Sequence, residues 1–194
     1  MGFIELKESP HATGVSPVRI HYREAGAGKP FVEDEGKSPH GRPVVFLHGG
    51  WGYGYYPIDR QIAALGGRRR FVMPDRSGYG ESSPVNAPAA MDFHRRAAEE
   101  TRAFLDAAGI AQCVLWGHSD GAVIAAMMGL AQPERDAGIV LEAFHFYKEK
   151  AGSREFFEKL AVNPKVLGER TQKRLAADHG AGRWEEVVRR NAEV

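Results

Sequence analysis

A serine with a glycine two positions away on either side is the first candidate for chemistry in this chain. The segment runs from Gly117 to Gly121 with Ser119 at its centre, between apolar runs at residues 113–116 and 122–130. The first run is typical of a strand and the second of a helix. A sharp strand-to-helix turn exposes a serine hydroxyl as a nucleophile, and the two glycines make that turn sterically possible. We predict that Ser119 is a catalytic nucleophile; the alternative is a serine that only caps the helix.

A second glycine-rich segment could supply the hydrogen-bond donors that such a nucleophile needs. Residues 48–52 read HGGWG and directly follow an apolar strand pattern at residues 43–47. Because glycine has no side chain, backbone N–H groups of this loop can approach a substrate and form an oxyanion hole. One donor would be the N–H of Gly50 or Trp51, and the other the N–H of Asp120, the residue after the serine. The alternative is a glycine-rich turn without a catalytic role.

A third polar segment follows the next predicted strand. Residues 75–82 read DRSGYGES and come directly after an apolar run at residues 71–73. We expect its polar side chains to brace neighbouring loops, and we assign it no direct chemistry.

The elements that position these segments alternate between strand and helix. This alternation predicts an α/β fold with a mostly parallel sheet and helices on both faces. The expected strands are residues 3–8, 18–24, 43–47, 71–73, 113–116 and 139–144, of which the first two form a hairpin closed by residues 10–17. The expected helices are residues 58–65, 93–108 (with Asp92 as cap and Gly109 as stop) and 122–130.

The character of the chain changes after the last predicted strand. Three amphipathic helices are expected at residues 154–161, 165–177 and 184–191, and no further strand. We therefore divide the chain into a core at residues 1–147 and a helical segment at residues 148–194, which could act as a lid over a site or serve only for packing.

Composition excludes several classes of protein. With 194 residues, 43% of them hydrophobic, the chain can bury a substantial core, and it has no apolar run long enough to span a bilayer. The net charge of +1 argues against a general nucleic-acid binder. The N-terminus lacks the pattern of a signal peptide, so we expect a cytoplasmic protein with no membrane partner. Cys113, the only cysteine, should be a small buried hydrophobe.

Together the three polar segments resemble the motifs of the α/β-hydrolase superfamily, and the resemblance extends from about Val18 to Phe144. Residues 48–50 are similar to the oxyanion loop after the third strand of that family, residues 75–82 to its D-x-R-G-x-G-x-S loop after the fourth, and residues 117–121 to its nucleophile elbow after the fifth. The resemblance implies that the serine attacks a carbonyl carbon and forms an acyl-enzyme, aided by a histidine that an acid holds. It implies a small-molecule substrate and no cofactor or metal, and it leaves the oligomeric state open.

The family's acid and histidine have no evident counterparts. They follow a seventh and an eighth strand, and neither His145 nor His179, the two histidines downstream of Ser119, occupies such a position. We therefore expect neither to be the general base, although His145 is the better alternative. His118 should point away from the serine because it is its direct neighbour. Glu142 could be the acid, but it is more simply explained as a strand-end residue.

The simplest account is that the chain is truncated at its C-terminus before the last two strand–helix units. The strand at residues 139–144 would then present a bare apolar edge. We expect a serine hydrolase that acts on a small ester, amide or related acyl substrate. The alternative is a non-catalytic member of the same fold that binds a ligand. A haloalkane dehalogenase is disfavoured, because a carboxylate would have to replace Ser119 and Asp120 lies one position away.

Overall fold

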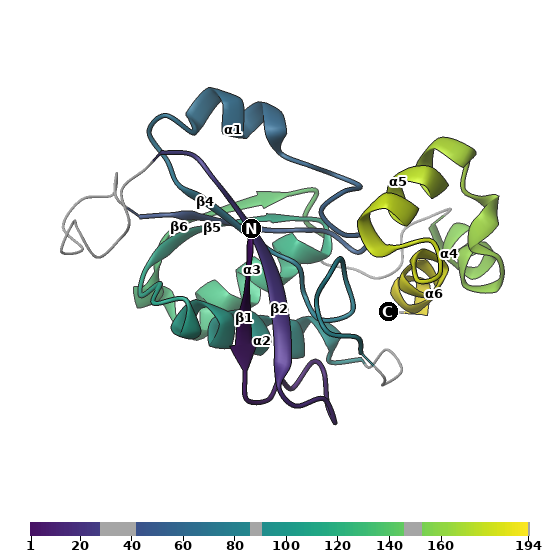
Figure 1. The fold of residues 1–194 in the computed structure, drawn as a ribbon, viewed down its shortest axis with the longest axis horizontal. Coiled ribbons are helices and arrows are strands. Elements are labelled where there is room, and N and C mark those ends of the chain that lie inside the picture. The colour runs from purple at the N-terminus through teal and green to yellow at the C-terminus, as the bar shows by residue number, and fades with distance from the viewer. Residues whose placement is uncertain (28–41, 86–90, 146–152, 194) are drawn as a thin grey trace.

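Six strands form one mixed sheet in the computed structural model, which describes residues 1–27, 42–85, 91–145 and 153–193 (Figure 1). The strands are β1 (Gly2–Leu6), β2 (Val18–Ala25), β3 (Val44–Leu47), β4 (Phe71–Pro74), β5 (Cys113–His118) and β6 (Asp136–Glu142). Their order is β1-β2-β4-β3-β5-β6. The hairpin β1–β2 and the pair β2–β4 are antiparallel, whereas β4, β3, β5 and β6 run parallel. The expected α/β fold class and the N-terminal hairpin are confirmed.

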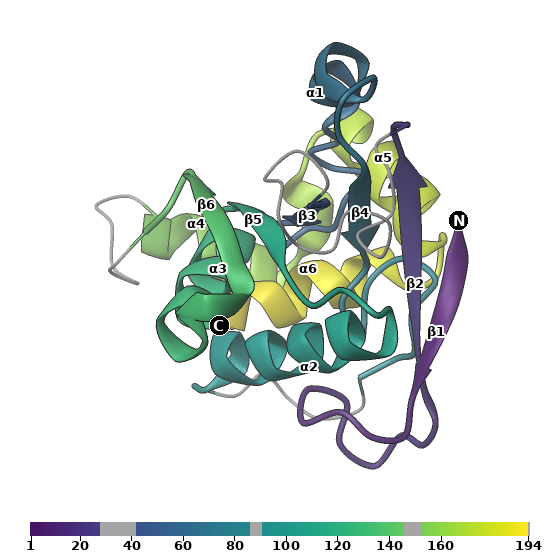
Figure 2. The same cartoon turned by 90° about the vertical axis from the view of Figure 1, so that its left-hand side faces the viewer.

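Helices cover both faces of this sheet. The described helices are α1 (Asp59–Leu65), α2 (Phe93–Ala107), α3 (Asp120–Ala131), α4 (Ser153–Val162), α5 (Glu169–His179) and α6 (Trp184–Glu193), with 3-10 turns at Pro133–Arg135 and Pro164–Val166. α2 and α3 lie on one face and α1 on the other (Figure 2). In the described part of the chain, no helix is both long enough and apolar enough to cross a membrane.

Strand β3 shows why a parallel strand reads as a continuous apolar run. Successive side chains of a strand point to opposite faces, and both faces of this sheet are covered. Val45 and Leu47 belong to a core that also contains Phe104 of α2. Phe46, by contrast, packs in a second core with Ile58, which precedes α1. All four residues of β3 are therefore buried.

The single cysteine lies in the first of these cores. Cys113 is buried at the start of β5, as expected. Burial, together with the nearby charge of Asp136, raises the pKa of its thiol to about 12. It is therefore a packing residue rather than a reactive thiolate at neutral pH.

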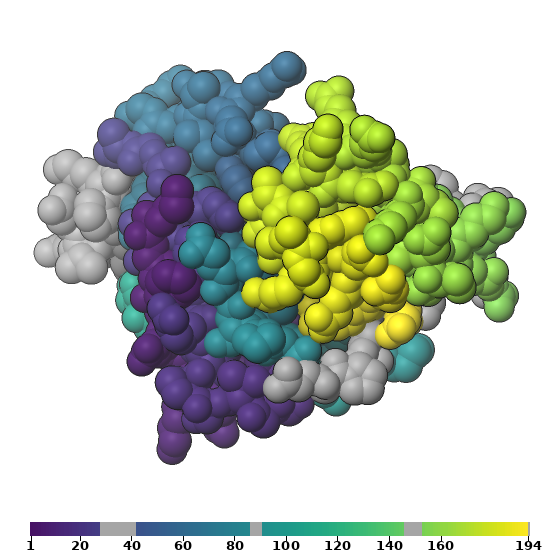
Figure 3. Space-filling model, turned by 45° about the vertical axis from the view of Figure 1, so that its right-hand side comes forward, coloured from purple at the N-terminus to yellow at the C-terminus, as the bar shows by residue number. Residues whose placement is uncertain are grey.

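The C-terminal helices have a core of their own. Its buried members are Leu160, Leu167, Leu175, Trp184 and Val188. Trp51 and Tyr55, which follow β3, pack against this core, so it is continuous with a loop of the sheet part. Figure 3 shows these helices, in yellow and yellow-green, against the blue and teal surface of earlier residues. The boundary expected between residues 147 and 148 lies outside the described residues.

Two local expectations differ from the structure. Asp92 stands at the N-cap of α2, but its carboxylate does not cap the helix and instead pairs with Arg95 at 2.6 Å and Arg96 at 2.8 Å. The single helix expected at residues 165–177 is a 3-10 turn followed by α5. Gly168 separates them because its ψ of 149° is extended rather than helical.

Strand β6 has an exposed apolar flank. Among the described strands it pairs with β5 alone. Ile139, Val140 and Leu141 are 41%, 47% and 41% exposed. The expected apolar edge is therefore present, and such an edge is open to pairing with a further strand.

Candidate active site

Ser119 occupies a strained turn between β5 and α3. Its backbone has φ 54° and ψ −122°, a conformation that a residue with a side chain rarely adopts. Its N–H donates to the carbonyl oxygen of Glu142 at 2.9 Å, which ties the turn to the end of β6. The sharp strand-to-helix turn expected from the glycine pattern is present. A strained backbone persists only where the surrounding structure holds it in place, and such residues cluster at functional sites.

The flanking glycines are required by close backbone packing. A Cβ atom on Gly121 would overlap the carbonyl oxygen of Leu47, and one on Gly117 would overlap the carbonyl oxygen of Gly121. The turn can therefore fit against the end of β3 only when both positions lack a side chain.

The glycine-rich loop after β3 lies beside the serine. β3 and β5 are neighbouring parallel strands, so the loops that follow them meet at the same edge of the sheet. A Cβ on Gly49 would lie 3.1 Å from the Cβ of Ser119. A Cβ on Gly50 would overlap the Asn191 side chain of α6. The shared edge is as expected, whereas the donor roles of the N–H groups of Gly50, Trp51 and Asp120 stay a prediction.

The side chain of Asp120 takes part in the site in a way that the sequence did not suggest. Its Oδ1 lies 3.1 Å from Nε2 of His94, and its Oδ2 accepts from Nδ2 of Asn191 at 2.8 Å. Burial alone would raise the pKa of this carboxyl, but the hydrogen bonds from His94 and Asn191 and the charge of Arg76 outweigh it and lower the pKa to about 2. Asp120 is therefore a buried carboxylate at neutral pH.

His179 is held in place by the loops around the site. Its Nδ1 accepts the N–H of Gly80 at 2.9 Å, and its Nε2 lies 3.0 Å from the carbonyl oxygen of Trp51. Because one nitrogen accepts and the other donates, the ring is the neutral Nε2–H tautomer. Both nitrogens are used in this way, which agrees with the expectation that His179 is not the general base.

The other two histidines near the serine differ in exposure. His145 is exposed, with Nε2 3.7 Å from Oδ1 of Asp120. The ring of His118 stacks on Tyr56, with a centroid distance of 3.9 Å. No hydrogen bond joins the Ser119 hydroxyl to either ring among the described contacts.

Glu142 is occupied by aromatic side chains at the end of β6. Its carboxylate accepts from the Tyr56 hydroxyl at 2.8 Å and lies 3.3 Å from Nε1 of Trp116. The hydrogen bond to this carboxylate raises the pKa of Tyr56. The described residues place no histidine in hydrogen-bond contact with Glu142, which favours its interpretation as a strand-end residue.

The segment at residues 75–82 braces the glycine-rich loop after β3, as expected. Arg76 donates to the carbonyl oxygens of His48 at 2.5 Å and Gly49 at 3.0 Å. Ser77 donates through its N–H and its hydroxyl to the buried carboxylate of Glu100 at 2.9 and 2.6 Å. Burial raises the pKa of Glu100, although the hydrogen bonds from Ser77 oppose this effect.

Comparison with known proteins covers most of the chain. A family model described as alpha/beta hydrolase fold matches residues 42–163. The chain is 32% identical over 141 residues to 2-hydroxy-6-oxo-6-phenylhexa-2,4-dienoate hydrolase of Burkholderia cepacia. The aligned region covers 72% of this chain and 43% of that protein. It is 30% identical over 121 residues to epoxide hydrolase 4 of Mus musculus, and the aligned region covers 61% of this chain and 30% of that protein. The chain thus spans less than half the length of these relatives.

Solved structures share the fold. A thermophilic esterase from Thermogutta terrifontis superposes with a TM-score of 0.64 at 15% identity, over 99% of this chain and 71% of the esterase. A meta-cleavage product hydrolase from Pseudomonas fluorescens gives a TM-score of 0.61 at 21% identity, over 97% of this chain and 67% of that structure. At these identities the likeness concerns the fold alone.

Proposed function

The chain belongs to the α/β hydrolase fold family, and on that premise we propose that it is a serine hydrolase acting on a small ester, amide or related acyl substrate. The observation that carries the proposal is the strained backbone of Ser119 at the junction of β5 and α3, beside the glycine-rich loop. The names of the relatives above, which describe hydrolases of small organic molecules, support it.

In the proposed reaction the Ser119 oxygen attacks the carbonyl carbon of the substrate. A C–O bond forms while the carbonyl electron pair moves onto the oxygen, and the N–H groups of Asp120 and of Gly50 or Trp51 stabilise that oxyanion. Collapse of the tetrahedral intermediate expels the alcohol or amine and leaves an acyl-enzyme. Water then attacks the acyl carbon, which releases the acid and restores the serine.

A base must take the proton of Ser119 in the first step. His179 is committed to two backbone partners, and the His118 ring stacks on Tyr56. In our proposal the triad acid and histidine are therefore not among the described residues, and His145 is the alternative within the chain.

A non-catalytic ligand-binding protein is the second candidate. It is favoured by one observation: the described contacts give the Ser119 hydroxyl no histidine partner. A serine without its base keeps only a residual rate enhancement of roughly 10³–10⁴-fold over water.

Covalent labelling separates the two candidates. A fluorophosphonate, which reacts with activated serine hydroxyls, should label Ser119 rapidly in a form of the protein that contains the triad acid and histidine, and only slowly in the 194-residue chain, as located by mass spectrometry of peptides. Ser119→Ala should abolish the label, and Ser16→Ala, which removes an exposed hydroxyl bonded to the carbonyl oxygen of Lys7, should not. A folded protein that contains the triad acid and histidine and binds small acyl compounds, but takes no label at Ser119, would overturn the proposal in favour of the ligand-binding protein.

A further inference from the structure

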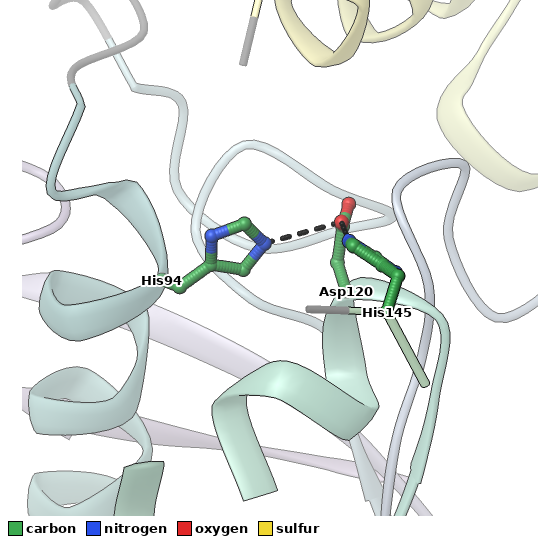
Figure 4. A group of neighbouring side chains, drawn as sticks. All are labelled: His94, Asp120 and His145. Atoms are coloured by element: carbon green, nitrogen blue, oxygen red, sulfur yellow. Dashed lines mark hydrogen bonds and ion pairs between the residues drawn. The ribbon is translucent and has the colours of Figure 1, made fainter. Parts of the chain in front are cut away.

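Three side chains from separate elements converge beside the serine turn. His94 lies on the first turn of α2, Asp120 begins α3, and His145 follows β6 (Figure 4). One ligand atom from each lies within 4.8 Å of the other two. Two imidazole nitrogens and a carboxylate are a common donor set for divalent transition metals.

Two of the distances in this group are close to those between the ligands of one ion. Nε2 of His94 is 3.1 Å and Nε2 of His145 is 3.7 Å from the same oxygen, Oδ1 of Asp120. For bonds of 2.0–2.2 Å in tetrahedral geometry, neighbouring ligand atoms lie about 3.3–3.6 Å apart, between these two values. The longer distance, that of His145, exceeds a hydrogen bond and is compatible with two ligands of one ion.

A hydrogen bond orients the carboxylate of Asp120, as is typical of a metal ligand. Its second oxygen accepts from Asn191 at 2.8 Å, which fixes the orientation of the group. Outer hydrogen bonds of this kind typically orient metal ligands. A carboxylate binds a metal ion in its deprotonated form. The positive charge of Arg76 opposes a second cation nearby, so the ion must be bound by direct ligation rather than by charge alone.

We propose that His94, Asp120 and His145 bind a divalent transition-metal ion of the zinc class, next to the serine turn. Three protein ligands leave at least one coordination position open, as in catalytic rather than structural zinc sites. The His145 side chain is 42% exposed, so an ion can reach the site from solvent. The site does not depend on the proposed role of Ser119, because its ligands are other side chains.

Metal titration of the 194-residue chain tests the proposal. Calorimetry with Zn²⁺ should give one equivalent of binding, and Co²⁺ should give the intense visible absorption of a low-symmetry, four-coordinate site. His94→Gln and His145→Gln should each lower the Zn²⁺ affinity at least ~10-fold and reduce the Co²⁺ absorption. Asn191→Ala, which removes only the outer hydrogen bond, should weaken binding by roughly 10–100-fold.

The matched control is His118→Gln, which removes an imidazole next to the same turn that is not a proposed ligand. It should leave Zn²⁺ stoichiometry and affinity unchanged. Circular dichroism of the metal-free variants checks that each is folded, and the exposed position of His145 keeps its variant informative if His94→Gln does not fold. The proposal is wrong if the folded wild-type chain binds no Zn²⁺, or if His145→Gln binds it as tightly as the wild type.

Discussion

The imidazole Nε2 of His179 lies 3.0 Å from the carbonyl oxygen of Trp51, although 128 residues separate them in the sequence. The same ring accepts the N–H of Gly80, and the neighbouring Asp178 accepts the N–H of Gly54 at 2.9 Å. The C-terminal end of α5 is thus bound to the loop after β3, which lies beside the serine, and to the loop after β4. This arrangement makes the helical segment a fixed support of the glycine-rich loop.

Replacing His179 should therefore destabilise the fold. His179→Ala removes two hydrogen bonds of a residue that is 3% exposed and leaves the N–H of Gly80 and the carbonyl group of Trp51 without this partner. We expect the free energy of unfolding to fall by about 2–4 kcal/mol, measured by urea denaturation. His145→Ala, at an exposed position, should change it by less than ~0.5 kcal/mol in a metal-free buffer. Equal effects of the two substitutions would contradict the proposed support.

The serine turn could be predicted from the sequence because its determinants are local. The segment passes directly from strand through the serine to helix. The two glycines indicate close backbone packing that a Cβ would prevent. Strands β3 and β4 were likewise recognisable from continuous apolar runs, since the side chains on both of their faces are buried.

The polar contacts around the turn could not be predicted in this way. Asp120 meets His94 and Asn191, which lie 26 and 71 residues away, and nothing in its sequence neighbourhood marks either partner. The resemblance to the α/β-hydrolase superfamily implied no metal, and His94 and His145 form no short-spaced ligand motif that would indicate one. Only the packing of α2, α3 and the segment after β6 brings them together.

Gly121→Ala should disrupt the serine turn. The new methyl group would overlap the carbonyl oxygen of Leu47, so either α3 or the end of β3 must move. We expect a loss of about 3 kcal/mol in the free energy of unfolding, measured by chemical denaturation. Gly67→Ala is the matched control because nothing lies within 4 Å of its added Cβ, and it should be nearly neutral. A Gly121→Ala protein as stable as Gly67→Ala would show that the turn packs differently.

The stability of the chain should fall in mild acid, in part because of His11. Burial, together with the charges of Arg76, Arg190, Arg96 and His94, lowers the pKa of this ring to about 3. In the unfolded chain this ring binds a proton near pH 6.5, whereas in the folded chain it binds one only near pH 3. The free energy of unfolding therefore decreases as the pH falls from about 6.5 to about 3. The loss from this group is about 1.4 kcal/mol per pH unit, or roughly 2 kcal/mol at pH 5.

His11→Leu should remove this contribution. The variant should lose less stability than the wild type between pH 7 and pH 5, as measured by urea denaturation at each pH. Some dependence should persist, because burial also lowers the pKa of His48 well below its usual value. If the free energy of unfolding changed with pH in the same way in both proteins, the pKa of His11 would not be lowered in the folded chain.

Ser119→Gly should stabilise the chain by relieving backbone strain. A non-glycine residue at φ 54° and ψ −122° costs about 1–3 kcal/mol, whereas glycine adopts such angles freely. Glycine also gives the unfolded chain more conformational freedom, which offsets up to about 1 kcal/mol of this stabilisation. We therefore expect a net increase of about 1 kcal/mol in the free energy of unfolding.

Ser119→Ala keeps a Cβ and therefore the strain, so it should leave the free energy of unfolding nearly unchanged. Ala143→Gly, at φ 50° after β6, should also stabilise the chain and serves as the matched case outside the turn. Denaturation of the three variants in parallel decides the point: if glycine stabilises position 143 but not position 119, the serine turn stores no strain, and the observation that carries the proposed function is lost.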